Sequence, residues 1–71
     1  MTQEEKEIVR SWLSWTNTVS RLRALIMAHQ TDEDRQAAYQ RRYHDALEKA
    51  AYWRAKAKQR SRSCLRLVTL H

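Results

Sequence analysis

The sequence predicts an all-α protein, an antiparallel two-helix hairpin that dimerises into a four-helix bundle and carries a short C-terminal tail. Three observations lead to this fold class. The 71 residues include neither glycine nor proline, so tight hairpin turns and helix breaks lack their usual residues. Apolar residues recur at alternating intervals of four and three in two long segments. A polar run, HQTDED at residues 29–34, separates these two segments.

The first helix is predicted over about residues 3–29. Thr2 and Glu5 have the spacing of a capping box, and Glu4 and Glu7 lie where the positive end of a helix dipole favours acids. The apolar face of this helix has coiled-coil spacing, and its seam consists of Ile8, Trp12, Trp15, Val19, Leu22 and Ile26. We expect this face to be packed along its whole length.

The second helix is predicted over about residues 32–60, with Thr31 as its N-cap. Its seam has the same spacing and consists of Tyr39, Tyr43, Ala46 and Ala50, continued by Trp53 and Ala57. Because about three residues join the two helices, the helices run antiparallel. This arrangement places Trp12 opposite Ala50, so that a large ring meets a small side chain.

Residues 1–61 therefore form one helical hairpin, and residues 62–71 form a basic and apolar tail that we expect to be strand-like or disordered. A frayed helix end, or a tail folded back over the hairpin, is the alternative. A lone hairpin leaves one side of its apolar stripe in water, and a second copy is the simplest cover for it. We therefore expect a homodimer.

The composition narrows the classes of partner. A net charge of +6 and a pI near 10.1 favour nucleic acid, an anionic surface or an acidic protein. The lack of a long apolar run predicts no membrane association, and the acidic N-terminus differs from a basic signal peptide, so we expect a cytoplasmic protein. With one cysteine, Cys64, and no zinc-type spacing, we expect no intrachain disulfide, no metal and no cofactor.

The second predicted helix carries the candidate binding surface. From residue 49 to the end of the chain no acid occurs, and the bases there extend well beyond the one turn on which a helix dipole acts. Tyr52 lies off the seam beside Trp53 and Arg54, a combination enriched at binding hot spots. Arg42, Lys49 and Lys56 belong to a row of bases that recurs every seven residues. The predicted partner-binding residues are Arg42, Lys49, Tyr52, Trp53, Arg54, Lys56 and Arg60.

An enzyme is not expected. Two packed helices without a glycine-rich loop offer little concavity for convergent catalytic groups or for a small-molecule substrate. His44 and Glu48 are four residues apart on one helix, but two ligands do not complete a metal site.

Two segments, TDED and RYHDALEKAA, resemble a family of small phage-encoded helical-hairpin proteins that take over host functions, the quorum-sensing anti-activators. The matching residues are Thr31, Asp32, Glu33, Arg41, Tyr43, Asp45, Ala46 and Leu47. The two matches lie two residues further apart here, and Lys49 stands where the family has tryptophan. The resemblance implies a dimeric hairpin that binds and disables a LuxR-type transcription regulator of the host.

The opening MTQEEK and the predicted hairpin also resemble the plasmid copy-number family of four-helix-bundle proteins, which implies binding to paired RNA loops. Two functions thus stand. The first is a non-enzymatic protein-binding module, a phage-type inhibitor or modulator that docks an acidic or DNA-binding host protein through the second helix and its basic end. The alternative is a nucleic-acid-binding bundle that contacts phosphates through the Lys and Arg face of that helix.

Overall fold

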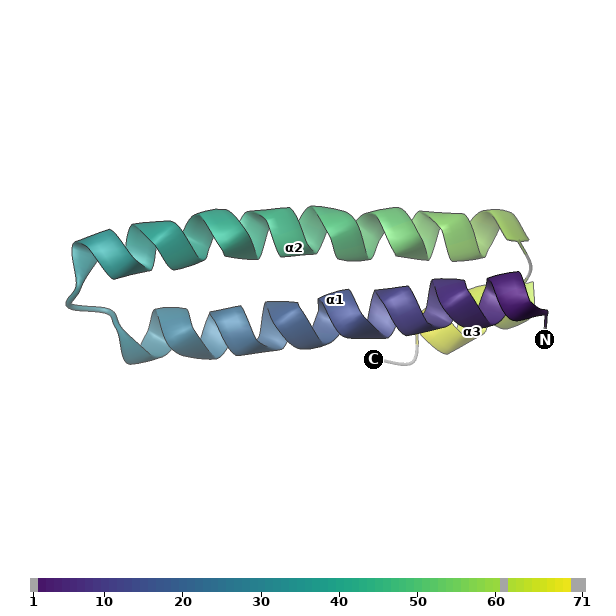
Figure 1. Ribbon diagram of the computed structural model, residues 1–71, viewed down its shortest axis with the longest axis horizontal. Coiled ribbons are helices and arrows are strands. Elements are labelled where there is room, and N and C mark those ends of the chain that lie inside the picture. The colour runs from purple at the N-terminus through teal and green to yellow at the C-terminus, as the bar shows by residue number, and fades with distance from the viewer. Residues whose placement is uncertain (1, 61, 70–71) are drawn as a thin grey trace.

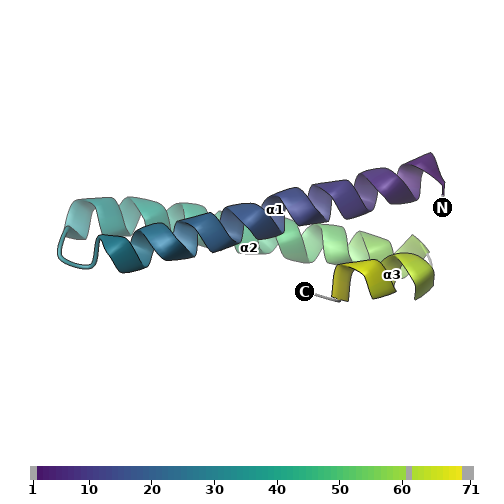
Figure 2. The ribbon, with the colours of Figure 1, turned by 90° about the horizontal axis from the view of Figure 1, so that it is seen from below.

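The computed structural model describes residues 2–60 and 62–69, which form three helices, α1 (Gln3–Ala28), α2 (Glu33–Arg60) and α3 (Arg62–Thr69). The long helices α1 and α2 lie side by side and antiparallel in a rod of 45 × 16 × 16 Å (Figure 1). α3 starts at the open end of the hairpin, near the N-terminus, and runs back along one side of it (Figure 2). The predicted all-helical hairpin is confirmed.

The caps explain where α1 begins and ends. The Thr2 hydroxyl accepts a hydrogen bond from the backbone N–H of Glu5 at 3.2 Å, and the Thr2 N–H donates to the Glu5 carboxylate at 3.5 Å. This is the predicted capping box. At the other end His29 leaves the helix with φ −118° and donates its N–H to the Leu25 carbonyl. A negative φ needs no glycine, which is how a glycine-free chain makes this turn.

α2 is capped by a different residue from the one predicted. The Asp32 carboxylate accepts a hydrogen bond from the backbone N–H of Arg35 at 3.2 Å, and its second oxygen lies 3.4 Å from Arg35 Nε. The prediction of Thr31 as N-cap is therefore wrong. Aspartate is at least as good a cap as threonine, and its charge also favours the N-terminal end of the helix dipole.

The seam residues chosen from the sequence all face the interior to some degree. The buried ones are Ile8, Trp12, Leu22, Ala46 and Ala57, and the half-buried ones are Trp15, Val19, Ile26, Tyr39, Tyr43, Ala50 and Trp53. Trp12 and Ala50 line one hollow, consistent with the expected opposition of large and small side chains. The half-buried members show that two helices alone do not close over the seam.

The core is concentrated at the open end of the hairpin. There Ile8 and Trp12 of α1, Ala57 of α2, and Cys64 and Val68 of α3 form one buried cluster. In residues 13–48, by contrast, only Leu22 and Ala46 are buried. We call residues 13–48 the loop half and the rest of the described chain the open half. The loop half is thus held by far less buried apolar surface than the open half.

The tail differs from the prediction. Its described part, residues 62–69, is the helix α3 and is neither strand-like nor disordered, while residues 70–71 lie outside the described residues. Cys64 and Val68 are four residues apart, so a helix places both on one face against Ile8 and Trp12. A strand of the same residues would present only every second side chain to that surface. Packing against the hairpin therefore overrides the strand-like composition.

Candidate protein-binding site

Two adjacent rings on α2 form the centre of the candidate site. The Tyr52 and Trp53 ring centroids are 5.3 Å apart with an interplanar angle of 82°, an edge-to-face contact. Trp53 is half-buried because it also packs against the core cluster, whereas Tyr52 is 53% exposed. The Tyr52 ring is therefore held in place by its contact with Trp53 and remains accessible to a partner.

Lys56 lies over both rings. Its Nζ is 5.3 Å from the Trp53 centroid and 5.5 Å from the Tyr52 centroid, within the range of a cation–π contact. The helix makes this geometry possible, because residues three and four apart share a face. Since Lys56 is exposed, its ammonium group stays accessible to an anionic group on a partner.

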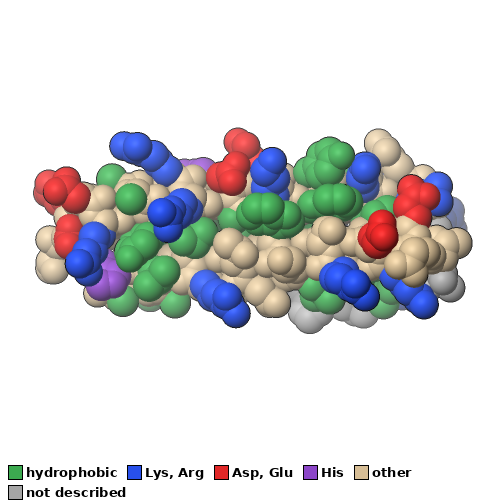
Figure 3. Space-filling view, in the orientation of Figure 1, with side chains coloured by type: hydrophobic (Ala, Val, Ile, Leu, Met, Phe, Trp, Pro, Cys, Tyr) green, Lys and Arg blue, Asp and Glu red, His purple; other side chains and the backbone are tan. Residues whose placement is uncertain are grey.

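Trp15 of α1 and Lys49 of α2 complete the site. Together with Glu48, Tyr52 and Trp53 they line an open hollow of about 380 Å³. We call Trp15, Lys49, Tyr52, Trp53 and Lys56 the aromatic cluster. In Figure 3 hydrophobic side chains form a band along the junction of the two long helices, with Lys and Arg side chains beside it. The site is shallow, with aromatic walls, two cations and one acid, Glu48.

The predicted partner-binding residues separate into two groups. Lys49, Tyr52, Trp53 and Lys56 come together in the aromatic cluster. The remaining three, Arg42, Arg54 and Arg60, lie apart from it. Arg42 is exposed on α2 seven residues before Lys49, about 10 Å along the helix.

Arg54 and Arg60 have other neighbours. Arg54 lines hollows next to Leu65 and Val68 of α3, and Lys56, two residues later, points to the opposite side of α2. Arg60 Nη2 lies 2.5 Å from Glu4 Oε2. The sequence predicts a capping box for Glu5 and a dipole interaction for Glu4 and Glu7, and it does not predict a partner for them on the second helix. The antiparallel fold brings Glu4 beside the basic end of α2.

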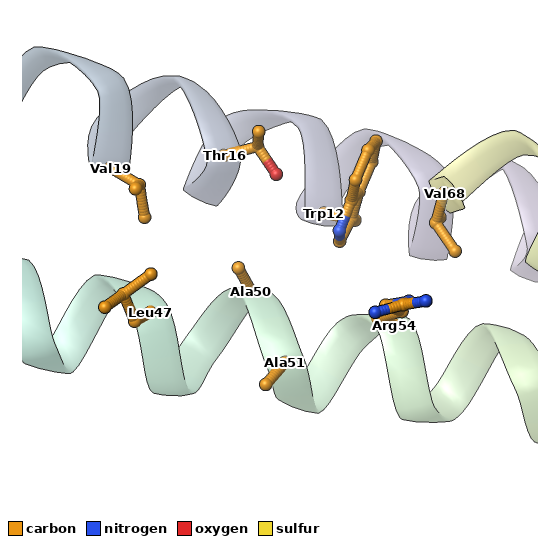
Figure 4. Close-up of a pocket in the computed structure, with 8 residues that line it drawn as sticks. All are labelled: Trp12, Thr16, Val19, Leu47, Ala50, Ala51, Arg54 and Val68. Carbon is orange, nitrogen blue, oxygen red and sulfur yellow. The ribbon is translucent and has the colours of Figure 1, made fainter. Parts of the chain in front are cut away.

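A second concave surface lies on the side of the hairpin that carries α3. One hollow of about 350 Å³ is bordered by Trp12, Val19, Leu47 and Val68 (Figure 4). A neighbouring hollow of about 450 Å³ lies between α2 and α3 and shares Ala51 and Arg54 with the first. Sequence reasoning missed this surface, because it exists only where α3 ends against the hairpin.

The charges are unevenly distributed along the molecule. The loop half holds equal numbers of bases and acids, namely Arg21, Arg23, Arg35, Arg41 and Arg42 against Asp32, Glu33, Asp34, Asp45 and Glu48. The open half holds nine bases and only the three acids Glu4, Glu5 and Glu7. The net charge of +6 is therefore a property of the open half, which contains the four α2 residues of the aromatic cluster.

A scan against protein-family models, a search of the curated proteins and a search of the solved structures each found no match to this chain. The site must therefore be interpreted from its own chemistry. Among residues 2–60 and 62–69, no three His, Cys, Asp or Glu side chains are grouped so as to hold a metal ion. None of the helices in the described part of the chain is long and apolar enough to cross a membrane.

Proposed function

We propose that this protein is a non-enzymatic protein-binding module whose aromatic cluster docks an acidic surface of another protein. The observation that carries the proposal is the exposed Tyr52 ring, supported edge-on by Trp53 and flanked by the Lys56 ammonium. Tyrosine and tryptophan supply contact area at low cost in conformational entropy, and such rings dominate binding energies when a partner excludes water around them.

The charge of the open half supports an acidic partner. Lys49 and Lys56 flank the rings, and the excess of bases in this half would steer an acidic surface toward them. The resemblance of the TDED and RYHDALEKAA segments to phage-encoded anti-activators suggests the kind of partner. On that basis the protein would inhibit or modulate a host transcription regulator in the host cytoplasm.

Capture from a bacterial lysate treated with nuclease tests the proposal. The immobilised protein is expected to retain one acidic protein in stoichiometric amount. Tyr52→Ala should weaken the affinity for that purified protein at least about tenfold, the effect of a hot-spot ring. His44→Ala serves as the control, because it also removes an exposed ring from α2 but lies outside the aromatic cluster. Circular dichroism checks that both variants stay helical.

Two results would contradict the proposal. Equal affinity of the Tyr52→Ala and His44→Ala variants would show that the aromatic cluster is not the binding site. A protein that is captured from an untreated lysate but not from a nuclease-treated one would favour the phosphate-binding alternative. In that case the protein should bind random duplex DNA or RNA with an affinity that falls steeply as the salt concentration rises.

We also propose that the protein acts as a homodimer in which the hairpins form a four-helix bundle. The support is the sparse core of the loop half, where two of the 36 residues from 13 to 48 are buried. A single core of this size seldom stabilises a domain by itself.

A further inference from the structure

α3 covers only part of the groove between α1 and α2. It lies over the open half (Figure 2), and Val68 in its last turn belongs to the same buried cluster as Trp12. Beyond Val68 the groove continues toward the loop as a hollow, with Val19 on α1 and Leu47 on α2 facing each other across it (Figure 4). Leu47 is 39% exposed. The groove is thus filled by a third helix at one end and left open at the other.

The loop half lacks cover elsewhere as well. Six large hydrophobic residues of the described chain are exposed, and four of them, Leu13, Leu25, Met27 and Leu47, belong to this half. Leu47 lines the groove, so the groove itself presents exposed apolar surface, and such surface on a small domain marks an interaction site. Leu13 and Leu25, twelve residues apart, lie on different sides of α1 and are not part of the groove.

The charge pattern favours a second copy of this chain as the partner. The loop half has five bases and five acids, so two loop halves can approach without net repulsion. The open half has nine bases and three acids, so two open halves repel each other. A second copy of this chain therefore fits the loop half, provided that its open half lies far from the first.

We propose that two copies pack through the uncovered groove of their loop halves, antiparallel and overlapping by about half their length, with α3 of each copy limiting the overlap. This inference rests on the proposed homodimer and specifies its geometry. A two-fold axis across the overlap brings Val19 and Leu47 of both copies into one interface. A full-length bundle on this face is excluded, because α3 occupies the groove in the open half.

The arrangement leaves the aromatic cluster free. Arg54 borders the groove next to α3, whereas Lys56 points to the other side of α2, so the aromatic clusters face outward on the dimer. The two open halves lie at opposite ends, which separates their positive charges. One dimer thus presents two basic, aromatic sites to partners.

Measurements on the unaltered protein test both the homodimer and its half-overlapping geometry. Sedimentation equilibrium should give twice 8.6 kDa, with a dissociation constant of about 1–100 μM because the overlap is smaller than a standard interface. Small-angle X-ray scattering should give a longest dimension of about 65 Å, since half of a helical hairpin is added to its length. A monomer at all these concentrations would overturn the homodimer, whereas a dimer no longer than 45 Å would overturn only the half-overlap.

A matched pair of variants locates the interface. Leu47→Glu places a carboxylate in the uncovered groove. Because the dimer would bury this charge without a partner, the dissociation constant of the dimer is expected to rise at least about tenfold. Asn17→Glu adds the same charge two residues before Val19, on the far side of α1, and should leave the dissociation constant of the dimer unchanged. Equal dimerisation of the two variants would overturn the assignment of the groove.

Discussion

Cys64 is the single thiol of the chain and lies in the core cluster between α3 and the hairpin. Burial raises its pKa above the ordinary value of 9.0, the negative charge of Glu5 raises it further, and the positive charge of Arg60 acts in the opposite direction. At neutral pH the protonated thiol therefore packs as a small apolar side chain. Its surroundings favour packing over reactivity.

The raised pKa of Cys64 predicts slow alkylation and a loss of stability at high pH. At pH 8 iodoacetamide should label the folded protein far more slowly than the protein unfolded in guanidinium. Because the pKa of the folded thiol exceeds that of the unfolded one, its contribution to stability is complete below pH 9 and is lost as the pH rises further. Urea titrations of the wild type and Cys64→Ala give the free energy of unfolding at each pH from 7 to 10. The dependence of this free energy on pH should differ between the two proteins only above pH 9. Labelling of the folded protein at the rate of an unfolded thiol would contradict the raised pKa.

The helix α3 depends on tertiary contacts. Eight residues are too few for a helix to be stable in water by itself, so packing of Cys64, Leu65 and Val68 on the hairpin must hold it. In return α3 covers Ile8, Trp12 and Ala57, which two helices alone would leave partly in water. Each element thus supplies the apolar surface that the other needs.

Neighbouring substitutions in α3 test this dependence. Val68→Asp buries a carboxylate against Trp12 and should lower the free energy of unfolding by about 2–4 kcal/mol. Leu67→Asp makes the same change at an exposed position and should cost less than about 1 kcal/mol. Chemical denaturation followed by circular dichroism measures both. If the two variants were equally stable, α3 would not contribute its packing to the fold.

At the scale of the whole molecule, the excess of positive over negative charge lies in the open half, where the fold also places most of the core. The Arg60–Glu4 pair offsets little of this charge, since both side chains are largely exposed and such pairs contribute at most about 1 kcal/mol. Repulsion among the remaining bases therefore opposes folding of the same half that burial stabilises.

Screening of this repulsion should make the protein more stable in salt. We expect the melting temperature to rise between about 10 and 150 mM NaCl, where the Debye length falls to about 8 Å. Lys58→Gln removes a base of the open half and should reduce the rise, while Arg23→Gln in the loop half should not. All samples are compared at one protein concentration, because dimerisation would also shift the transition. A melting temperature that falls as salt is added would show that repulsion among the bases of the open half does not limit the stability of the protein.

Much of the fold follows from local rules that the sequence states directly. The seam spacing predicted both long helices, the Thr2–Glu5 pair predicted the capping box, and the polar run at residues 29–34 predicted the turn. Four of the seven predicted partner-binding residues share one site because helical periodicity alone places them there. These features depend on residues a few positions apart, so the sequence is sufficient for them.

Only the tertiary structure decided the rest. It made a helix of residues 62–69, placed Arg54 beside α3, and paired Arg60 with Glu4, which is 56 residues away. It also divided the molecule into an open half that is covered and charged and a loop half that is uncovered and neutral. The physical reason is that burial and ion pairing depend on which segments meet in space, and a weak local preference yields when a neighbouring apolar surface needs cover.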